Sequence, residues 1–222
     1  MKTQTYNSYQ YSYNLGAPRH ERHLTTSPKE LKHIAVAAAL VMAIGVSIGL
    51  YGNFFGGFSF TWTVVMMVVF AVIMTGSFLT HEVGHKIMAQ KSGLWAEFRL
   101  TTWGAALTLI SVFLPFRMIS PGAMMIAGTP NGKELVKISL AGPIVNMIFA
   151  SALLGIAFSP LPATWSALMF FAAYINAFMA IFNLVPFGIL DGYKIFSFDK
   201  KAWAIAFSVS IVLTIIAVIY TF

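Results

Sequence analysis

The chain has 222 residues, of which 58% are hydrophobic and 9% are charged. Soluble domains contain about 25% charged residues, so this composition excludes an ordinary soluble protein and predicts an integral membrane protein. The length predicts one compact helical bundle without a separate soluble domain of ordinary size. Cysteine is absent, which excludes a disulfide framework and thiolate metal ligands and leaves histidine and carboxylate side chains as candidate ligands.

Residues 1–32 form a polar and basic segment before the first apolar stretch. The segment does not resemble a signal peptide, because the apolar run begins late and no small-residue cleavage site follows a short hydrophobic region. We predict a flexible cytoplasmic tail that ends in a basic collar at the membrane. His20, His23 and His33 are expected to be solvated rather than to bind metal.

Apolar stretches follow the tail, and each is near the length that a helix needs to cross the hydrocarbon core, although the third is short. They cover residues 34–51, 61–90, 100–116, 135–158, 165–187 and 203–221.

The lysines and arginines predict the topology of these stretches. The connectors at 52–60 and 159–164 contain no lysine or arginine, whereas the tail, residues 86–137 and residues 188–202 contain all fourteen. The positive-inside rule therefore places the N-terminus and both basic regions on the cytoplasmic side. The net charge of +7 is explained by this asymmetry, and nucleic acid is not needed as a partner.

Residues 100–116 are flanked by Arg99 and Arg117, which a single crossing would place on opposite sides of the membrane. Length alone would favour an ordinary crossing helix, but the symmetry of charge favours a re-entrant or membrane-dipping segment. Short strands fit residues 94–102, where apolar and polar side chains alternate. The predicted fold is an all-α integral membrane protein, a polytopic bundle of about five crossing helices plus this segment.

His81, Glu82 and His85 form an H-E-x-x-H motif after the uncharged residues 61–80. Helical residues four apart share one face, so both imidazoles can reach one metal ion while the glutamate points toward whatever the metal binds. The alternative is a helical face that satisfies itself by hydrogen bonding. Polar side chains at membrane depth are costly and usually functional, which favours a zinc site.

Asp191 is the best candidate for a third ligand among the seven acidic residues. It ends an apolar run that Pro186 and Gly188 should break, so the bent backbone can direct the carboxylate back into the bundle. Because 100–116 does not cross, the chain returns to the side of the histidines at this point. Four other acidic residues lie in the tail or in a hydrophilic loop, where a solvated charge is expected: Glu21, Glu30, Glu97 and Glu134.

Three segments carry a resemblance to a known family: HEVGH at 81–85, AGPIVN at 141–146 and NLVPFGILDG at 183–192. In order and spacing they resemble the core of the site-2 protease family of intramembrane zinc metalloproteases. The resemblance covers about residues 61–192. We predict a single transmembrane protease domain over residues 33–222, with the catalytic core at about 61–192.

The resemblance also implies the roles of the site residues. His81, His85 and Asp191 would bind one zinc ion per chain, and Glu82 would act as the general base. Asn183 would hold the substrate carbonyl or its oxyanion. Three protein ligands leave zinc an open position for water, which makes this set suitable for hydrolysis.

The chain departs from the family pattern beside the aspartate. The family often has a second proline before it and a second glycine after it, where this chain has Ile189 and Tyr193. These differences affect the geometry of the loop rather than the identity of the ligands. Without the motif, Asn183 could equally bridge two helices, and Asn146 and Asn176 are interpreted as structural.

The predicted function is zinc-dependent hydrolysis of a peptide bond in a membrane-embedded protein or peptide, with the lipid bilayer as surroundings. A strand within residues 94–118 could pair with an extended substrate. Gly45 and Gly49 form a small-xxx-small pair, which usually serves packing and only weakly indicates a homo-oligomer.

Two alternatives remain open at this stage. A membrane metal-binding or metal-transport protein could use the same cluster, but it should carry further ligands along its path, and the stretches 34–51 and 203–221 offer none. A noncatalytic relative that binds membrane peptides should lose Glu82 first, and Glu82 is present.

Overall fold

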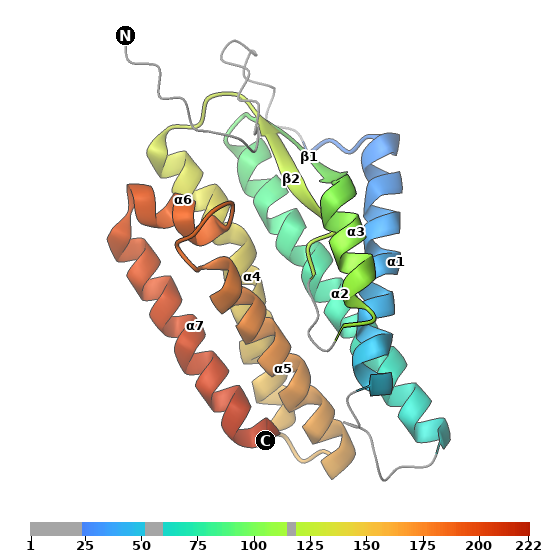
Figure 1. Ribbon diagram of the computed structural model, residues 1–222. Helices are drawn as coiled ribbons and strands as arrows, with labels where there is room; N and C mark the ends of the chain where they lie inside the picture. Colours follow the sequence, from blue (N-terminus) through green and yellow to red (C-terminus); the bar gives the residue numbers. More distant parts are fainter. Residues whose placement is uncertain (1–23, 52–59, 115–118) are drawn as a thin grey trace.

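The fold is described by a computed structural model of the chain (Figure 1). Four residues named above lie outside the described residues: His20, Glu21 and His23 of the predicted tail, and Arg117. The structure describes residues 24–51, 60–114 and 119–222.

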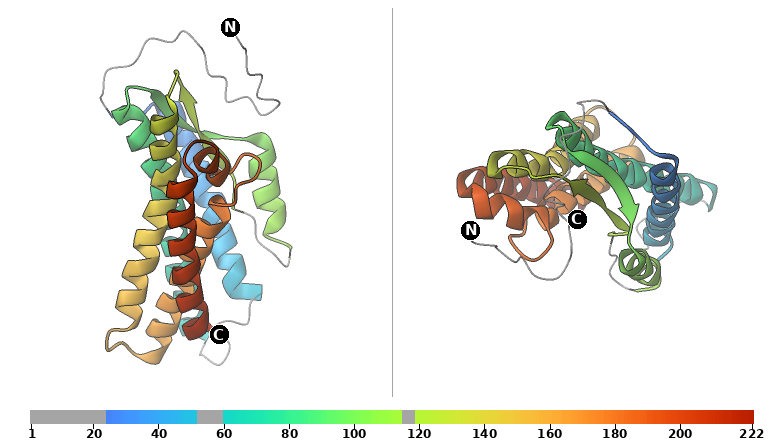
Figure 2. Two further views of the ribbon diagram at one scale, coloured as in Figure 1. Left: turned by 90° about the vertical axis from the view of Figure 1, so that its left-hand side faces the viewer. Right: turned by 90° about the horizontal axis from the view of Figure 1, so that it is seen from above.

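Five long apolar helices make up the bundle, and each is long and apolar enough to cross a membrane. This finding confirms the predicted multi-pass membrane protein with about five crossing helices. In both side views the helices run along one another, with α2 packed on α1 and α4, and α5 packed on α4 and α7 (Figures 1 and 2). The five are α1 (Pro28–Tyr51), α2 (Phe60–Lys91), α4 (Gly132–Ala157), α5 (Ala163–Asn183) and α7 (Lys200–Thr221).

A small antiparallel sheet lies at one end of the bundle (Figure 1). Its strands are β1 (Trp95–Leu100), which confirms the strand predicted near 94–102, and β2 (Gly122–Ala127). The sequence did not predict β2, because its residues Gly-Ala-Met-Met-Ile-Ala show no alternation of apolar and polar side chains.

The predicted re-entrant segment begins and ends at this sheet. Leu100 pairs with Gly122, so the chain between them leaves the sheet and returns to the same place. Its helix, α3 (Thr102–Ser111), has 10 residues, about 15 Å, which is half of the hydrocarbon thickness. In Figure 2 it lies on the outside of the bundle, beside α1. A helix of this length and the shared start and end at the sheet both agree with the prediction that residues 100–116 do not cross.

The boundary of the predicted tail was wrong, because α1 begins at Pro28. Glu30, which was assigned to the tail, is fully buried and lies 2.6 Å from the ammonium group of Lys86. Glu97, predicted to be solvated, is 8% exposed. His33 lies in α1, and its Nδ1 accepts the backbone N–H of the last residue of β1. Periodicity along one segment could not reveal that the sheet packs on the start of α1.

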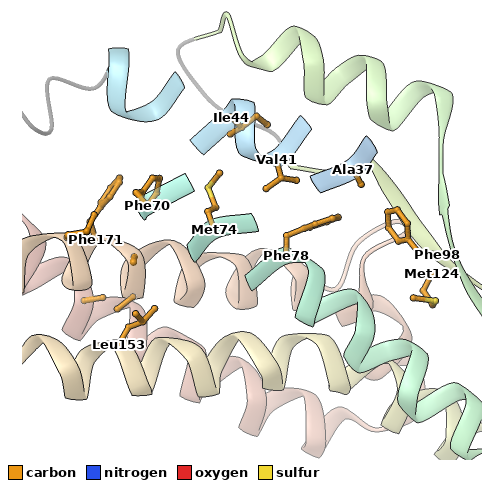
Figure 3. Packing of buried hydrophobic residues seen from close by; sticks show 14 of the residues in the cluster. Ala37, Val41, Ile44, Phe70, Met74, Phe78, Phe98, Met124, Leu153 and Phe171 are labelled. Atoms are coloured by element: carbon orange, nitrogen blue, oxygen red, sulfur yellow. The ribbon is translucent and has the colours of Figure 1, made fainter. Parts of the chain in front are cut away.

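The apolar core joins the helices to the sheet. Figure 3 shows side chains from α1 and α2 meeting Phe98 of β1 at one end and Phe171 of α5 at the other. A Cβ at Gly45 would lie 2.6 Å from the Cα of Ala71, so this glycine lets α1 and α2 approach closely. Gly45 therefore serves helix packing within the chain, as the packing interpretation of this glycine predicted.

A short helix, α6 (Asp191–Phe198), was not predicted. It follows a bend at which Gly188 has a φ of 62°, a conformation that favours glycine. A Cβ at Gly192 would lie 2.1 Å from a carbonyl oxygen at the end of α5. The two glycines therefore let the chain fold sharply back, which sets the start of α6 against the bundle.

Candidate metal centre

His81 and His85 lie on one face of α2 and are 4% and 6% exposed. Their Nε2 atoms are 3.1 Å apart. The i, i+4 spacing on a helix brings the two rings together, as the motif predicted. Both nitrogens therefore point at one small volume inside the bundle.

Asp191 completes this group as the first residue of α6. Its Oδ2 lies 3.0 Å from Nε2 of His85 and 3.8 Å from Nε2 of His81. All three ligand atoms lie within 4.8 Å of one another, and no other such cluster of histidines and carboxylates occurs in the described part of the chain. The structure thus brings together the three residues that the sequence predicted as ligands.

The surroundings of these atoms fit a zinc ion. A Cβ placed on Gly142 of α4 would lie 2.4 Å from Nε2 of His85 and 2.6 Å from Nε2 of His81. The glycine therefore leaves open the space onto which both nitrogens converge. Two imidazoles and one carboxylate are a ligand set typical of catalytic zinc. The three side chains could accordingly hold the metal, with one position left for water or substrate.

The outer nitrogens of both histidines are held by carbonyl oxygens. Nδ1 of His81 lies 2.5 Å from Oδ1 of Asn146, and Nδ1 of His85 lies 2.7 Å from the backbone oxygen of Ile138. A carbonyl oxygen only accepts, so each Nδ1 carries the hydrogen and each Nε2 keeps its lone pair free for a metal. Both rings are thereby fixed in the tautomer that a ligand needs.

Asn146 therefore does more than the structural role expected for it. Its side-chain nitrogen also lies 3.4 Å from Oδ1 of Asn176, which links α4 to α5 behind His81. The sequence held a signal for this role, because ligand histidines usually donate their second nitrogen to a fixed acceptor. Asn176 remains structural, since its amide donates to a backbone oxygen of its own helix.

Glu82 and Asn183 face the same cavity as the three candidate ligands. The cavity has a volume of about 120 Å³ and is lined by both side chains together with residues of β2. Met124 of that strand lines the cavity as well. The amide of Asn183 donates to the oxygen of Met179 in its own helix, 2.9 Å away, so the alternative of a bridge between two helices is not observed.

Lys194 is a site residue that the sequence did not reveal. It lies one helical turn after Asp191, lines the cavity, and places Nζ 3.2 Å from Oδ1 of the aspartate. Burial alone would raise the pKa of Asp191, but His85 and Lys194 outweigh burial and hold it below its usual range. The aspartate is therefore ionised, with Oδ1 toward the lysine and Oδ2 toward the histidines. The i, i+3 spacing of Asp191 and Lys194 was the available signal.

The chain is 34% identical over 156 residues to "Putative zinc metalloprotease MJ0611" of Methanocaldococcus jannaschii, and the match covers 67% of this chain and 80% of the relative. The chain belongs to this family of zinc metalloproteases. The membership agrees with the resemblance to site-2 proteases that its motifs carry.

A second relative in this zinc metalloprotease family is "Zinc metalloprotease MJ0392" of the same organism. It is 30% identical over 169 residues, which are 76% of this chain and 41% of that relative, so the match spans less than half of the second protein. No family model and no solved structure matches the chain.

Proposed function

We propose that this metalloprotease is an intramembrane zinc endopeptidase of the site-2 protease type, which hydrolyses a peptide bond of a membrane-embedded protein. The observation that carries the proposal is the cavity, in which three candidate ligands, Glu82 and Asn183 meet among helices long and apolar enough to span a membrane. A soluble protease has no need to place such a site among lipid-facing helices.

His81, His85 and Asp191 would hold one zinc ion per chain. When bound, zinc supplies Lewis acidity, which polarises the scissile carbonyl and lets water lose a proton near neutral pH. The carboxylate of Glu82 accepts that proton at its oxygen and delivers it to the nitrogen of the leaving amine. The side-chain amide of Asn183 can donate a hydrogen bond to the carbonyl oxygen as negative charge develops there.

The edge of β2 is suited to hold an extended substrate. The N–H groups of Phe98 and Leu100 point away from β2. In an antiparallel pair, the residues opposite such positions also point their backbone groups away from the neighbouring strand. Their partners Met124 and Gly122 therefore direct their N–H and C=O groups to the free edge of β2. Both partners line the cavity. A peptide strand added along this edge would have its carbonyls exposed beside Glu82, as cleavage of a helical membrane segment requires.

The transport alternative is less well supported. A transport path needs successive ligand clusters, whereas residues 24–51, 60–114 and 119–222 contain a single group of the required residue types. The noncatalytic alternative would leave Glu82 without a reason to face the cavity. Hydrolysis uses both the ligand group and the glutamate.

Metal removal tests the proposed activity. The protein reconstituted in vesicles with a single-span substrate is expected to cleave it, to lose cleavage after dialysis against a zinc chelator, and to regain it with about one zinc per chain. The cleaved fragments are measured by mass spectrometry, and magnesium serves as the control ion because it prefers oxygen ligands. Unchanged cleavage by metal-free protein would contradict the proposal.

The proposed orientation places the sheet and the metal centre toward the cytoplasm. The chain contains no cysteine, so single cysteines report the side of the membrane cleanly. Cysteines at the exposed positions Lys91 and Lys133 are expected to react with an impermeant maleimide from the cytoplasmic side, and one at Ser159 from the other side. If Lys91→Cys and Lys133→Cys were labelled from opposite sides, the re-entrant interpretation of residues 100–116 would fail.

A further inference from the structure

A buried ion pair lies behind the sheet, and no step of hydrolysis uses it. Glu30 of α1 is 0% exposed, and its Oε2 accepts a hydrogen bond from Nζ of Lys86, 2.6 Å away. The same ammonium donates to Oγ1 of Thr26 at 2.9 Å. Lys86 directly follows the ligand His85 on α2. The pair therefore connects the start of α1 to the part of α2 that carries the metal centre.

The second oxygen of Glu30 connects this pair to the sheet. Its Oε1 accepts the backbone N–H of Phe98 in β1, at 3.0 Å. Two residues further on, the N–H of Leu100 donates to Nδ1 of His33, at 3.2 Å. Both amides lie on the edge of β1 that faces away from β2, because alternate residues of a strand point their backbone groups to opposite sides.

Gln90 contributes from the other helix. It lies four residues after Lys86 on α2, and its side-chain nitrogen donates to the backbone oxygen of Ala96 in β1, at 3.0 Å. Its side-chain oxygen accepts the N–H of Thr25, at 3.2 Å. The backbone groups of Ala96, Phe98 and Leu100 thus bind side chains of α1 and α2. These contacts occupy the edge of β1 at which a third strand would otherwise pair.

Stability alone is a weak reason for this arrangement. Removing two charges from water is costly, and apolar residues of similar volume often replace a buried ion pair without loss of stability. Such residues could not accept the N–H of Phe98 or fix the strand in one register. The polar contacts therefore have a geometric consequence that apolar packing would lack.

We propose that Glu30 is a positioning residue, which Lys86 holds in place, and that it fixes the sheet relative to the metal centre. With the outer edge of β1 bound to side chains, the edge of β2 is left to face the cavity at a set distance from Glu82. The part of this inference that concerns substrate rests on the proposed function. The part that concerns the sheet does not.

Two double variants without the charges of the ion pair separate the effect of these charges from the effect of the acceptor that holds the N–H of Phe98. Glu30→Gln with Lys86→Met removes both charges but keeps an acceptor for the N–H of Phe98, whereas Glu30→Leu with Lys86→Met removes the acceptor as well. We expect amide hydrogen exchange in residues 95–100 and 122–127 to rise about tenfold or more in the leucine variant alone. Zinc content and melting temperature should stay near those of the wild type in both.

The kinetic result should follow the exchange result. In the leucine variant KM for a transmembrane substrate should rise several-fold with kcat less affected, while the glutamine variant restores the wild-type KM. His33→Leu removes the acceptor of Leu100 without touching the ion pair, and it should raise exchange in the same strands. This variant decides the matter if the leucine double variant does not fold.

Equal exchange in the wild type, the leucine double variant and His33→Leu would overturn the inference. Equal loss in the glutamine and leucine double variants would also overturn it, because charge rather than the acceptor would then matter. A wild-type protein that cleaves nothing would refute the proposed function, while the exchange measurement would still decide whether Glu30 positions the sheet.

Discussion

Glu82→Gln is expected to leave zinc bound and the fold intact while cleavage falls by a factor of roughly 10²–10⁴ or more. Glutamine has nearly the same shape as glutamate, but its amide cannot accept the proton of the attacking water. The three candidate ligand atoms belong to His81, His85 and Asp191, so metal binding is not expected to depend on the carboxylate of Glu82. The measurement is the initial rate of substrate cleavage, together with zinc per chain.

Glu134→Gln is the matched control. Its carboxylate belongs to the capping box of α4, where it accepts the N–H of Asn131 at 2.9 Å, and glutamine can fill the same role. The control should therefore cleave at the wild-type rate. If Glu82→Gln with zinc bound also cleaved at that rate, Glu82 would not be the base, and the metal-transport alternative would regain support.

Much of the bundle could be predicted because membrane-spanning helices are encoded locally. A run of apolar residues of sufficient length must become a helix in lipid, since each backbone group has to be satisfied within the segment. The break after α5 was equally local, because Pro186 and Gly188 cannot continue a regular helix. The spacing of His81 and His85 determined their common face for the same reason.

The sheet and its support depend on contacts distant in sequence, and these were predicted poorly. The apolar run of β2 becomes a strand because Leu100 and Gly122 meet across the re-entrant segment. From the sequence, Glu30 is predicted to be a solvated tail residue. In the structure its carboxylate accepts the backbone N–H of Phe98, which lies 68 positions later. Neither contact leaves a periodic pattern in its own segment, so only the folded chain reveals it.

At the candidate metal centre, too, some features are encoded locally and others depend on contacts distant in sequence. Ligand types and spacings are visible in the sequence, whereas the residues that orient the ligands come from other helices. Asn146 reaches His81 from α4, 65 positions away. The AGPIVN motif carried the family resemblance and contained this asparagine, yet the role of its glycine and asparagine became clear from their distances to the histidines.

Gly142→Ala is expected to weaken zinc binding by a factor on the order of 10–100 or more, the range found when residues supporting a metal site are changed. The added methyl carbon would lie 2.4 Å from Nε2 of His85, which is too close for any real contact. Either α4 must move away or the histidine must turn its nitrogen from the metal. Both movements separate the ligands, and cleavage should fall along with zinc occupancy.

Gly155→Ala in the same helix is the matched control, because a Cβ there would meet nothing within 4 Å. Both substitutions raise helix propensity by about 1 kcal/mol, so a difference between them reports the contact with the ligands. Zinc affinity is measured by competition with a chromophoric chelator, and melting temperature is followed in parallel. Wild-type affinity in Gly142→Ala would mean that the two Nε2 atoms do not share a metal at this position. A loss confined to Gly142→Ala would place the metal in the space that this glycine leaves open.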